Sequence, residues 1–416
     1  MHRIFRPVRF LRQRQRRRGL TTPAVAVALL VIMMGLALIV DRIWLETAQL
    51  ELWTAAESAA LAAAGELASD RLLQPNTAID LRMNNARQIG GWIAEQNYVC
   101  GSPVTLNVQS EGDIRFGHLV EETQGTHFKE SSDNPTTVVV TALRTRANNN
   151  PVALFVTGAT GLPFGDVATR AEATIENSIV GLRPFEGSPI PALPIAIWKN
   201  DPTGRRSDTW DNLIESMRGA DEYSYDEETH AITAVADGLP EIRLHSLRIG
   251  GDTTAANVQL LDVGTALNDR ELMRQFETGI SVDDLKSFDG EMWLGQGEEL
   301  DLTSSPEMRE TELAGFQQLI GERRICFLYS TATPQRQSPI ATTTCTAIVA
   351  VRVMVVTSNS DGSCDVTVQP SVMTSRTALL ASEVEEASWP TPLNSNGNNV
   401  PSTRPNRYLY KMRLTN

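Results

Sequence analysis

The sequence lacks the local motifs through which several large enzyme classes act. Its 416 residues contain no Gly-x-x-x-x-Gly-Lys-Ser/Thr phosphate loop, no His-Glu-x-x-His zinc helix and no Gly-x-Ser-x-Gly nucleophile turn. Histidine is scarce, and its five residues are scattered between His2 and His245. We therefore expect a protein that is not an enzyme, with no catalytic, cofactor-binding or metal-binding residues.

Acidic residues are missing from the first twenty positions, which contain eight arginines. The whole chain has a net charge of −13, so the residues after this segment carry −21. A surface that acidic repels the phosphate backbone of DNA and RNA. The charge distribution therefore predicts that nucleic acid is not a partner.

Long apolar runs are also rare, and we find one that is long enough to cross a bilayer, at residues 21–40. Twenty uncharged residues in a helix extend about 30 Å, one hydrocarbon thickness. Basic residues before a first span stay on the cytoplasmic side. We expect that role for Arg12, Arg14, Arg16, Arg17 and Arg18, with the bulk of the chain exported. A cleaved secretory signal is the alternative, although its apolar region is usually about 7 to 15 residues long.

After the apolar run, small and apolar residues recur at steps of three and four, which indicates a helical stripe. The stripe comprises Leu45, Ala48, Leu52, Ala55, Ala59 and Ala62. Alanine allows close approach of a second helix, so the stripe is a candidate seam for a membrane-anchored partner helix or a second copy of this chain. The alternative is a rigid stalk whose alanines favour helix formation or pack on the protein's own exported domain.

An Arg18-Gly19 step precedes the apolar run, Val40-Asp41 ends it, and residues 55–64 form an alanine-rich run. In these features the N-terminal segment resembles TadE/TadG-like proteins of the Flp pilus (tight adherence) system. Weaker similarity continues through residues 136–158 and the strand before 193–197. The resemblance implies a component of pilus assembly or surface attachment in the bacterial inner membrane, with a periplasmic or extracellular bulk. Its implied partners are other Tad/Flp pilus-assembly or pilin-like proteins.

The sequence departs from this family's pattern in two ways. Pilin-like relatives carry a glutamate at the fifth position after the processed glycine, and Ala24 occupies that position here. Many TadG proteins also contain a von Willebrand A domain, whose Asp-x-Ser-x-Ser metal motif is missing from this sequence. A fixed anchor is therefore expected. A processed minor pilin-like subunit cut after Gly19 and a membrane-tethered envelope hydrolase remain alternatives.

Beyond the stalk, alternating patterns such as Val104, Leu106 and Val108 predict strands. Five prolines between positions 184 and 202 predict a connection between two lobes. We predict an α+β fold with a single N-terminal transmembrane helix, an alanine-rich helical extension and a β-rich exported region. The expected divisions are 1–20 basic cytoplasmic segment, 21–40 transmembrane helix, 41–72 helical stalk, 73–183 β-rich lobe, 184–204 proline-rich linker, 205–388 α+β lobe and 389–416 flexible tail.

Cysteine is limited to Cys100, Cys326, Cys345 and Cys364, all beyond the apolar run. In an oxidising compartment these four allow three disulfide pairings, among which the sequence does not choose. A bridge within the second lobe is compatible with the spacing, and free buried thiols are the alternative. Two acidic clusters, at residues 221–228 and 283–291, could supply oxygen ligands for calcium. Neither has the spacing of a calcium loop, so we interpret both as solvated loops.

Overall fold

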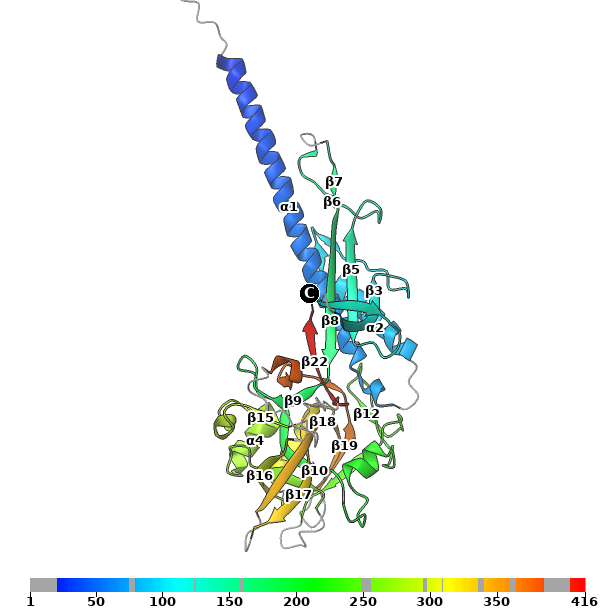
Figure 1. Ribbon diagram of the computed structural model, residues 1–416, viewed down its shortest axis with the longest axis vertical. Helices are drawn as coiled ribbons and strands as arrows, with labels where there is room; N and C mark the ends of the chain where they lie inside the picture. Colours follow the sequence, from blue (N-terminus) through cyan, green and yellow to red (C-terminus); the bar gives the residue numbers. More distant parts are fainter. Residues whose placement is uncertain are drawn as a thin grey trace, which may run out of the picture.

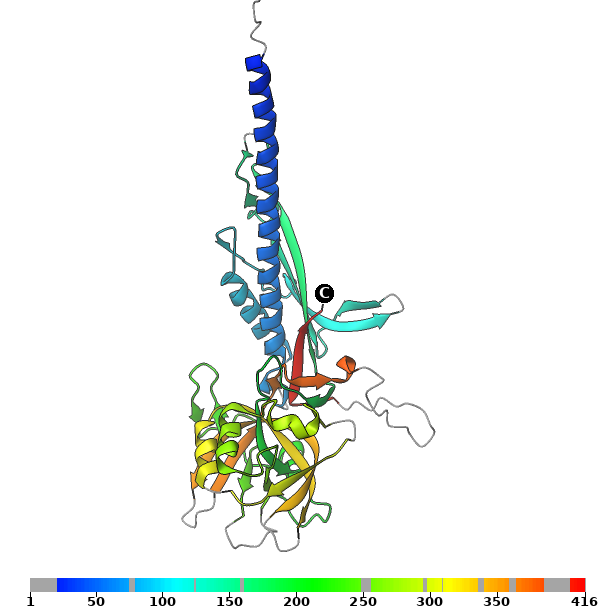
Figure 2. The ribbon, with the colours of Figure 1, turned by 90° about the vertical axis from the view of Figure 1, so that its left-hand side faces the viewer.

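The computed structural model describes an elongated molecule with a projecting helix and two lobes (Figures 1 and 2). We call them the stalk lobe, which lies beside the lower half of the helix, and the barrel lobe, which lies at its end. The architecture confirms the predicted α+β class with an N-terminal apolar helix followed by a β-rich region. The described residues are 21–74, 79–122, 125–157, 161–247, 256–294, 298–308, 310–335, 340–358, 364–384 and 405–415.

Helix α1 (Thr21–Leu67) is a single continuous helix of 47 residues. At 1.5 Å per residue it is about 70 Å long, roughly twice the span of a bilayer core. Residues 22–36 are exposed and project beyond both lobes, whereas the helix from Asp41 onward packs on the stalk lobe (Figure 2). The apolar run and the alanine-rich stalk are therefore one element.

The stalk lobe is built on a six-stranded sheet of order β20-β22-β8-β5-β3-β4. Helix α1 packs across β8 and β5, and α2 (Ile79–Glu95) packs beside α1. All neighbours in this sheet are antiparallel except the parallel pair β20 and β22. The strands are β3 (Ile114–Glu122), β4 (Gly125–Glu130), β5 (Thr137–Arg144), β8 (Val167–Glu176), β20 (Met373–Thr374) and β22 (Leu409–Leu414).

The barrel lobe contains a seven-stranded sheet of order β13-β19-β18-β16-β14-β10-β17. An additional pairing between β17 and β18 closes five of these strands into a barrel, because β18 also begins the run β18-β16-β14-β10-β17. Side chains alternate between two cores, so Phe327 and Tyr329 belong to one hydrophobic cluster and Cys326 and Leu328 to the other. The strands are β10 (Ala192–Trp198), β13 (Ile242–His245), β14 (Val258–Leu261), β16 (Leu300–Ser305), β17 (Arg323–Pro334), β18 (Ala341–Ser358) and β19 (Cys364–Pro370).

Short elements connect and cover the two main sheets. A three-stranded sheet joins β15 (Met292–Trp293), β9 (Ile179–Leu182) and β21 (Ala378–Leu380). Two-residue strands pair as β1 (Tyr98–Val99) with β2 (Ser102–Pro103), β6 (Val152–Ala153) with β7 (Phe164–Gly165), and β11 (Ser224–Tyr225) with β12 (Ile232–Thr233). The remaining helices are α4 (Asp269–Thr278), α5 (Glu310–Gln318), η1 (Asp70–Leu72), η2 (Asp211–Glu215), η3 (Asp284–Phe288) and η4 (Ala381–Glu383).

The segment expected to be a proline-rich linker contains a central barrel strand instead. Strand β10 lies between β14 and β17, and six of its seven residues are buried. Pro194 is accommodated because the pairing with β17 shifts register between Ala192 and Ala196, and proline is tolerated at such irregularities. The prediction of a linker at 184–204 is therefore wrong for β10.

The tail expected to be flexible also contains a strand. Within the predicted tail, β22 pairs with β8 from Lys411 to Leu414 and places the end of the described chain in the stalk lobe (Figure 1). Tyr408 and Leu409 are buried, so this strand is fixed by its core-facing residues as well as by its pairing. Residues 385–404 lie outside the described part of the chain, so the prediction is corrected only for β22.

Candidate functional site

The first half of α1 forms an exposed apolar surface. Leu30 and Met33 are 61% and 68% exposed, although side chains of this kind are buried in most folded domains. In the described part of the chain, α1 is the one helix long and apolar enough to cross a membrane. The five arginines expected to orient it, at positions 12, 14, 16, 17 and 18, lie outside the described residues.

The alanine-rich stripe of α1 faces the protein's own stalk lobe. Ala48, Leu52, Ala55 and Ala59 have no exposed surface, and Leu45 and Ala62 are half-buried. The stripe belongs to the same hydrophobic core as residues of α2, β5 and β8. In this structure the stripe thus packs on the chain's own stalk lobe, which was the alternative to a partner helix. The prediction that the stripe binds a partner helix is corrected accordingly, because the stalk lobe already covers the alanines of the stripe.

Asp41 attaches the stalk lobe to α1 at the end of the apolar run. Its Oδ1 accepts hydrogen bonds from the backbone N–H groups of Phe155 (2.9 Å) and Val156 (3.3 Å). One turn further along α1, the Trp44 indole N–H donates to the Ala153 carbonyl (3.1 Å). The Trp44 ring also packs on Phe155, with centroids 4.8 Å apart. The β6–β7 hairpin is thereby held against the helix.

Asp70 attaches the other end of the stalk to the barrel lobe. Its Oδ1 accepts from the Ser371 hydroxyl (2.7 Å) and the Val372 backbone N–H (2.6 Å). Its Oδ2 lies 3.0 Å from Nη2 of Arg352, whose side chain is only 3% exposed. Arg352 also pairs with Glu227 and lies over the Tyr225 ring, 3.7 Å from its centroid. We call this cluster the Asp70 clamp.

Asp41 on α1 and Asp70 on η1, just after α1, were not among the sequence-predicted site residues. Asp41 was noted only as the residue that follows the apolar run, and Asp70 carried no sequence signal. Their partners lie more than 100 residues away in the chain, so no local pattern links them.

The disulfide expected within the barrel lobe does not form between Cys326 and Cys345. Both are free thiols, and they lie in different hydrophobic cores on opposite faces of the sheet. Burial raises the pKa of both thiols, to about 12 for Cys345. A raised pKa disfavours the reactive thiolate, so these side chains act as small apolar groups.

Cys364, on the neighbouring strand, is too distant from Cys345 to form that bridge. Cys364 begins β19 opposite Ser358, which lies thirteen positions, or about 40 Å of strand, from Cys345. A disulfide requires Cα atoms within about 7 Å. Cys100 is a free thiol in the stalk lobe, where its backbone N–H donates to Glu51 (2.8 Å).

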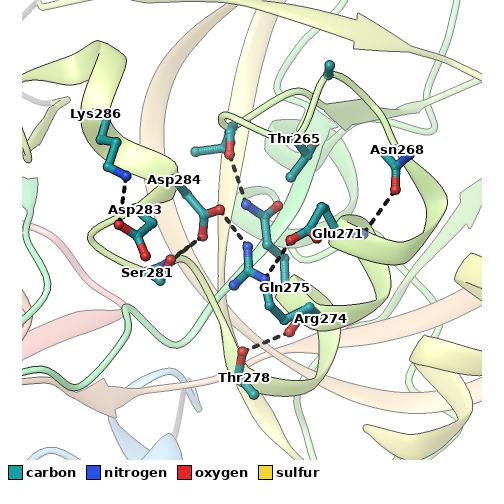
Figure 3. Close-up of polar contacts among 12 residues, drawn as sticks. Thr265, Asn268, Glu271, Arg274, Gln275, Thr278, Ser281, Asp283, Asp284 and Lys286 are labelled. Carbon is teal, nitrogen blue, oxygen red and sulfur yellow. Dashed lines mark hydrogen bonds and ion pairs between the residues drawn. The ribbon is translucent and has the colours of Figure 1, made fainter.

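The acidic residues near position 284 are paired within the barrel lobe (Figure 3). Asp284 is buried, lies 2.5 Å from Nη2 of Arg274, and accepts the N–H and hydroxyl of Ser281. Asp283 pairs with Lys286 at 2.9 Å. Among the described residues, no group of three or more His, Cys, Asp or Glu side chains is arranged to hold a metal ion. These hydrogen bonds and ion pairs thus hold the loop between α4 and η3 against α4.

A pocket of about 610 Å³ opens at one end of the barrel. Its walls include the side chains of Trp198, Arg206, Gln259 and Tyr329, with the Arg206 guanidinium 4.8 Å from the Trp198 ring centroid. Barrel mouths of this size commonly bind ligands in other proteins. Sequence patterns did not indicate this pocket, because its walls come from four separate strands and several loops.

The barrel mouth lies at the end of the molecule away from the apolar half of α1. Strand β17 begins at Arg323, which contacts Asp70, and ends at the pocket residue Pro334. Eleven residues of strand extend about 36 Å. The pocket is thus separated from the Asp70 clamp by the length of the barrel.

Comparison with known proteins gives one match. Residues 19–66 match the family model described as a putative Flp pilus-assembly TadE/G-like segment. Neither the curated proteins nor the solved structures gave a match. The matched range coincides with the apolar run and the buried alanine stripe of α1, and the resemblance seen in the sequence is confirmed there. Over residues 19–66 the N-terminal helix of this chain is therefore similar to the TadE/G-like Flp pilus-assembly family.

Proposed function

We propose that this protein is a membrane-anchored, non-catalytic TadG-like component of Flp pilus assembly or surface attachment. In this proposal α1 crosses the bacterial inner membrane with the arginine-rich N-terminus in the cytoplasm. The stalk and barrel lobes then lie in the periplasm or outside the cell, where they bind pilus or envelope components.

The observation that carries the proposal is the continuity of α1 from a free apolar segment into the core of a folded lobe. A signal peptide that is cleaved off would not need to continue into a helix whose second half is buried in a protein core. Here Asp41 and Asp70 hold the helix at two points about 40 Å apart. The anchor and the exported lobes therefore form one mechanical unit, which suits a fixed assembly component.

The barrel mouth favours binding over catalysis. Asp201, at its rim, accepts hydrogen bonds from the backbone N–H groups of Arg206, Thr203 and Arg205. These bonds, of which that from Arg206 contributes most, lower its pKa to about 2. An aspartate with that pKa is a poor general base. Trp198 and Tyr329 instead offer aromatic surface for a ligand from the envelope.

Photo-crosslinking in native membranes tests this role. Photo-reactive residues replace Leu50 on α1 and Trp92 on α2, because both side chains are 60% exposed. Ala55, with no exposed surface, is the matched control on the same helix. We expect positions 50 and 92 to capture pilus-assembly or pilin-like proteins, while position 55 yields only crosslinks within the chain.

The same cells provide the outcomes that contradict the proposal. Absence of intermolecular products at 50 and 92, with the protein present in the membrane, would remove the assembly role. A mature N-terminus at Leu20 would instead identify a processed pilin-like subunit. Protease added to spheroplasts should digest both lobes, and their protection would overturn the proposed orientation.

A further inference from the structure

The β6–β7 hairpin of the stalk lobe reaches the end of the apolar run. Residues 152–165 contain no charged side chain, and Arg146 and Asp166 form an ion pair (3.2 Å) next to the hairpin's base. Within the described part of the hairpin, Phe155 is 63% exposed, Leu162 56% and Phe164 42%. Three large apolar side chains thus face outward on a small uncharged element.

Contacts with α1 give the direction in which the hairpin runs. Ala153 is bound at the level of Trp44, and Phe155 is bound at the level of Asp41. The chain therefore advances toward the N-terminal, apolar half of the helix. Figure 1 shows β6 and β7 at the end of the stalk lobe that lies farthest from the barrel lobe.

Ala37 shows that the protein covers α1 above Asp41. It lies one turn nearer the N-terminus on the same face as Asp41, because residues four apart share a helix face. Ala37 is 8% exposed, whereas its neighbours Leu36 and Leu38 are 56% and 58% exposed. One helical turn is about 5 Å. The stalk lobe therefore covers α1 for about 5 Å on the N-terminal side of Asp41, within the apolar run.

We infer that the β6–β7 hairpin inserts its exposed Phe155, Leu162 and Phe164 side chains into the outer leaflet interface of the membrane that α1 crosses. The expected partner is lipid, because Asp41 holds the hairpin next to the apolar run of α1. The exposed apolar side chains of the hairpin therefore continue the apolar surface of the helix. Interfacial regions favour aromatic and aliphatic side chains flanked by charges. The inference rests on the proposed membrane anchor.

Depth-resolved quenching on the full chain, purified and reconstituted in phosphatidylcholine and phosphatidylglycerol vesicles, tests this inference. A fluorescent coumarin amino acid replaces Leu162 in the hairpin, Leu30 in the span or Val282 in the barrel lobe. Val282 is the matched control because its exposed fraction is also 56%. Nitroxide groups are placed on the lipids either near the headgroup or deep in the acyl chains.

We expect the shallow nitroxide to quench position 162 several-fold more than position 282. The deep nitroxide should quench position 30 most strongly. If position 162 behaves like 282 while 30 is quenched, the anchor stands and the hairpin inference fails. If position 30 is also unquenched, the anchor itself fails and the inference falls with it. Because the vesicles contain no other protein, quenching at 162 cannot come from a partner's surface.

Discussion

Glu241 is a carboxylic acid buried between the barrel sheet and its covering loops. Its two oxygens accept the backbone N–H groups of Glu222 (2.9 Å) and Tyr223 (3.1 Å). Burial is the main cause that raises its pKa from 4.5 to about 7, and the nearby Asp221 and Asp237 add to the increase. The folded protein therefore holds a proton that the unfolded chain has already released.

This pKa predicts that stability decreases as pH rises between 4.5 and 7. In that window the folded state binds more protons than the unfolded state, so the free energy of unfolding falls with pH. The expected loss attributable to Glu241 is about 2–3 kcal/mol. Denaturant unfolding in detergent, followed by tryptophan fluorescence at several pH values, measures it.

The variant Glu241→Gln is the control, because glutamine does not titrate. Its absolute stability can differ, but the part of the pH slope that belongs to this residue should vanish. Other carboxyl groups with raised pKa, such as Asp237 and Glu66, titrate in both proteins. Identical slopes in the two proteins would show that folding does not raise the pKa of Glu241.

At the scale of elements, the close packing of α1 and α2 depends on Gly90. A Cβ atom there would lie 3.0 Å from Ile114 Cδ1 and 3.2 Å from both the Ala59 carbonyl oxygen and Ala63 Cβ. Gly65, near the C-terminal end of α1, has no such neighbour within 4 Å. The same substitution at the two glycines should therefore have opposite effects.

We predict that Gly90→Ala destabilises the protein by about 1–3 kcal/mol, because a filled interface must move apart. Gly65→Ala should stabilise it by up to about 1 kcal/mol, because alanine loses less backbone entropy in a helix. Thermal or denaturant unfolding in detergent measures both. Stabilisation by both substitutions would mean that α1 and α2 are not packed closely at Gly90.

Elements defined by local patterns could be predicted from the sequence, and those defined by distant partners could not. The apolarity and 3-4 spacing of α1 are visible in neighbouring residues, so its span and its stripe were found. Strand β10 was missed because its prolines suggested a linker, and its tolerance of Pro194 depends on a register shift against β17. Strand β22 was missed because its partner β8 lies more than 230 residues earlier.

The candidate site shows the same limit. The helical pattern placed Ala48, Ala55 and Ala59 on one face, but it could not decide between a partner helix and the protein's own sheet. That choice depends on where β5 and β8 pack, which is a property of the tertiary fold. The barrel mouth and the Asp70 clamp likewise combine residues from separate parts of the chain.

For the whole molecule, the Asp70 clamp determines whether the two lobes move together. Asp70→Ala removes the acceptor of the Val372 N–H and leaves the buried Arg352 with Glu227 as its remaining carboxylate in the clamp. We predict a loss of about 2–4 kcal/mol in unfolding free energy. Faster hydrogen exchange at the Val372 amide would locate the effect.

Glu291→Ala provides the comparison for an ion pair outside the clamp. Glu291 pairs with Arg183 at 2.9 Å, and the Arg183 side chain is half exposed. Such a pair should contribute less than about 1 kcal/mol. Equal losses for Asp70→Ala and Glu291→Ala would mean that the clamp is no stronger than a surface ion pair.

The return of β22 to the stalk lobe has a consequence for synthesis and export. Helix α1 and strand β8 leave the ribosome early, whereas β22, which covers one edge of β8, comes from residues 409–414. The entire barrel lobe is therefore synthesised, and in the proposed topology exported, before the sheet beside α1 is complete. Until then the edge of β8 remains open to pair with another extended chain. In the proposed topology, the time taken to export and fold the barrel lobe thus determines how long the edge of β8 can pair with a strand from another chain.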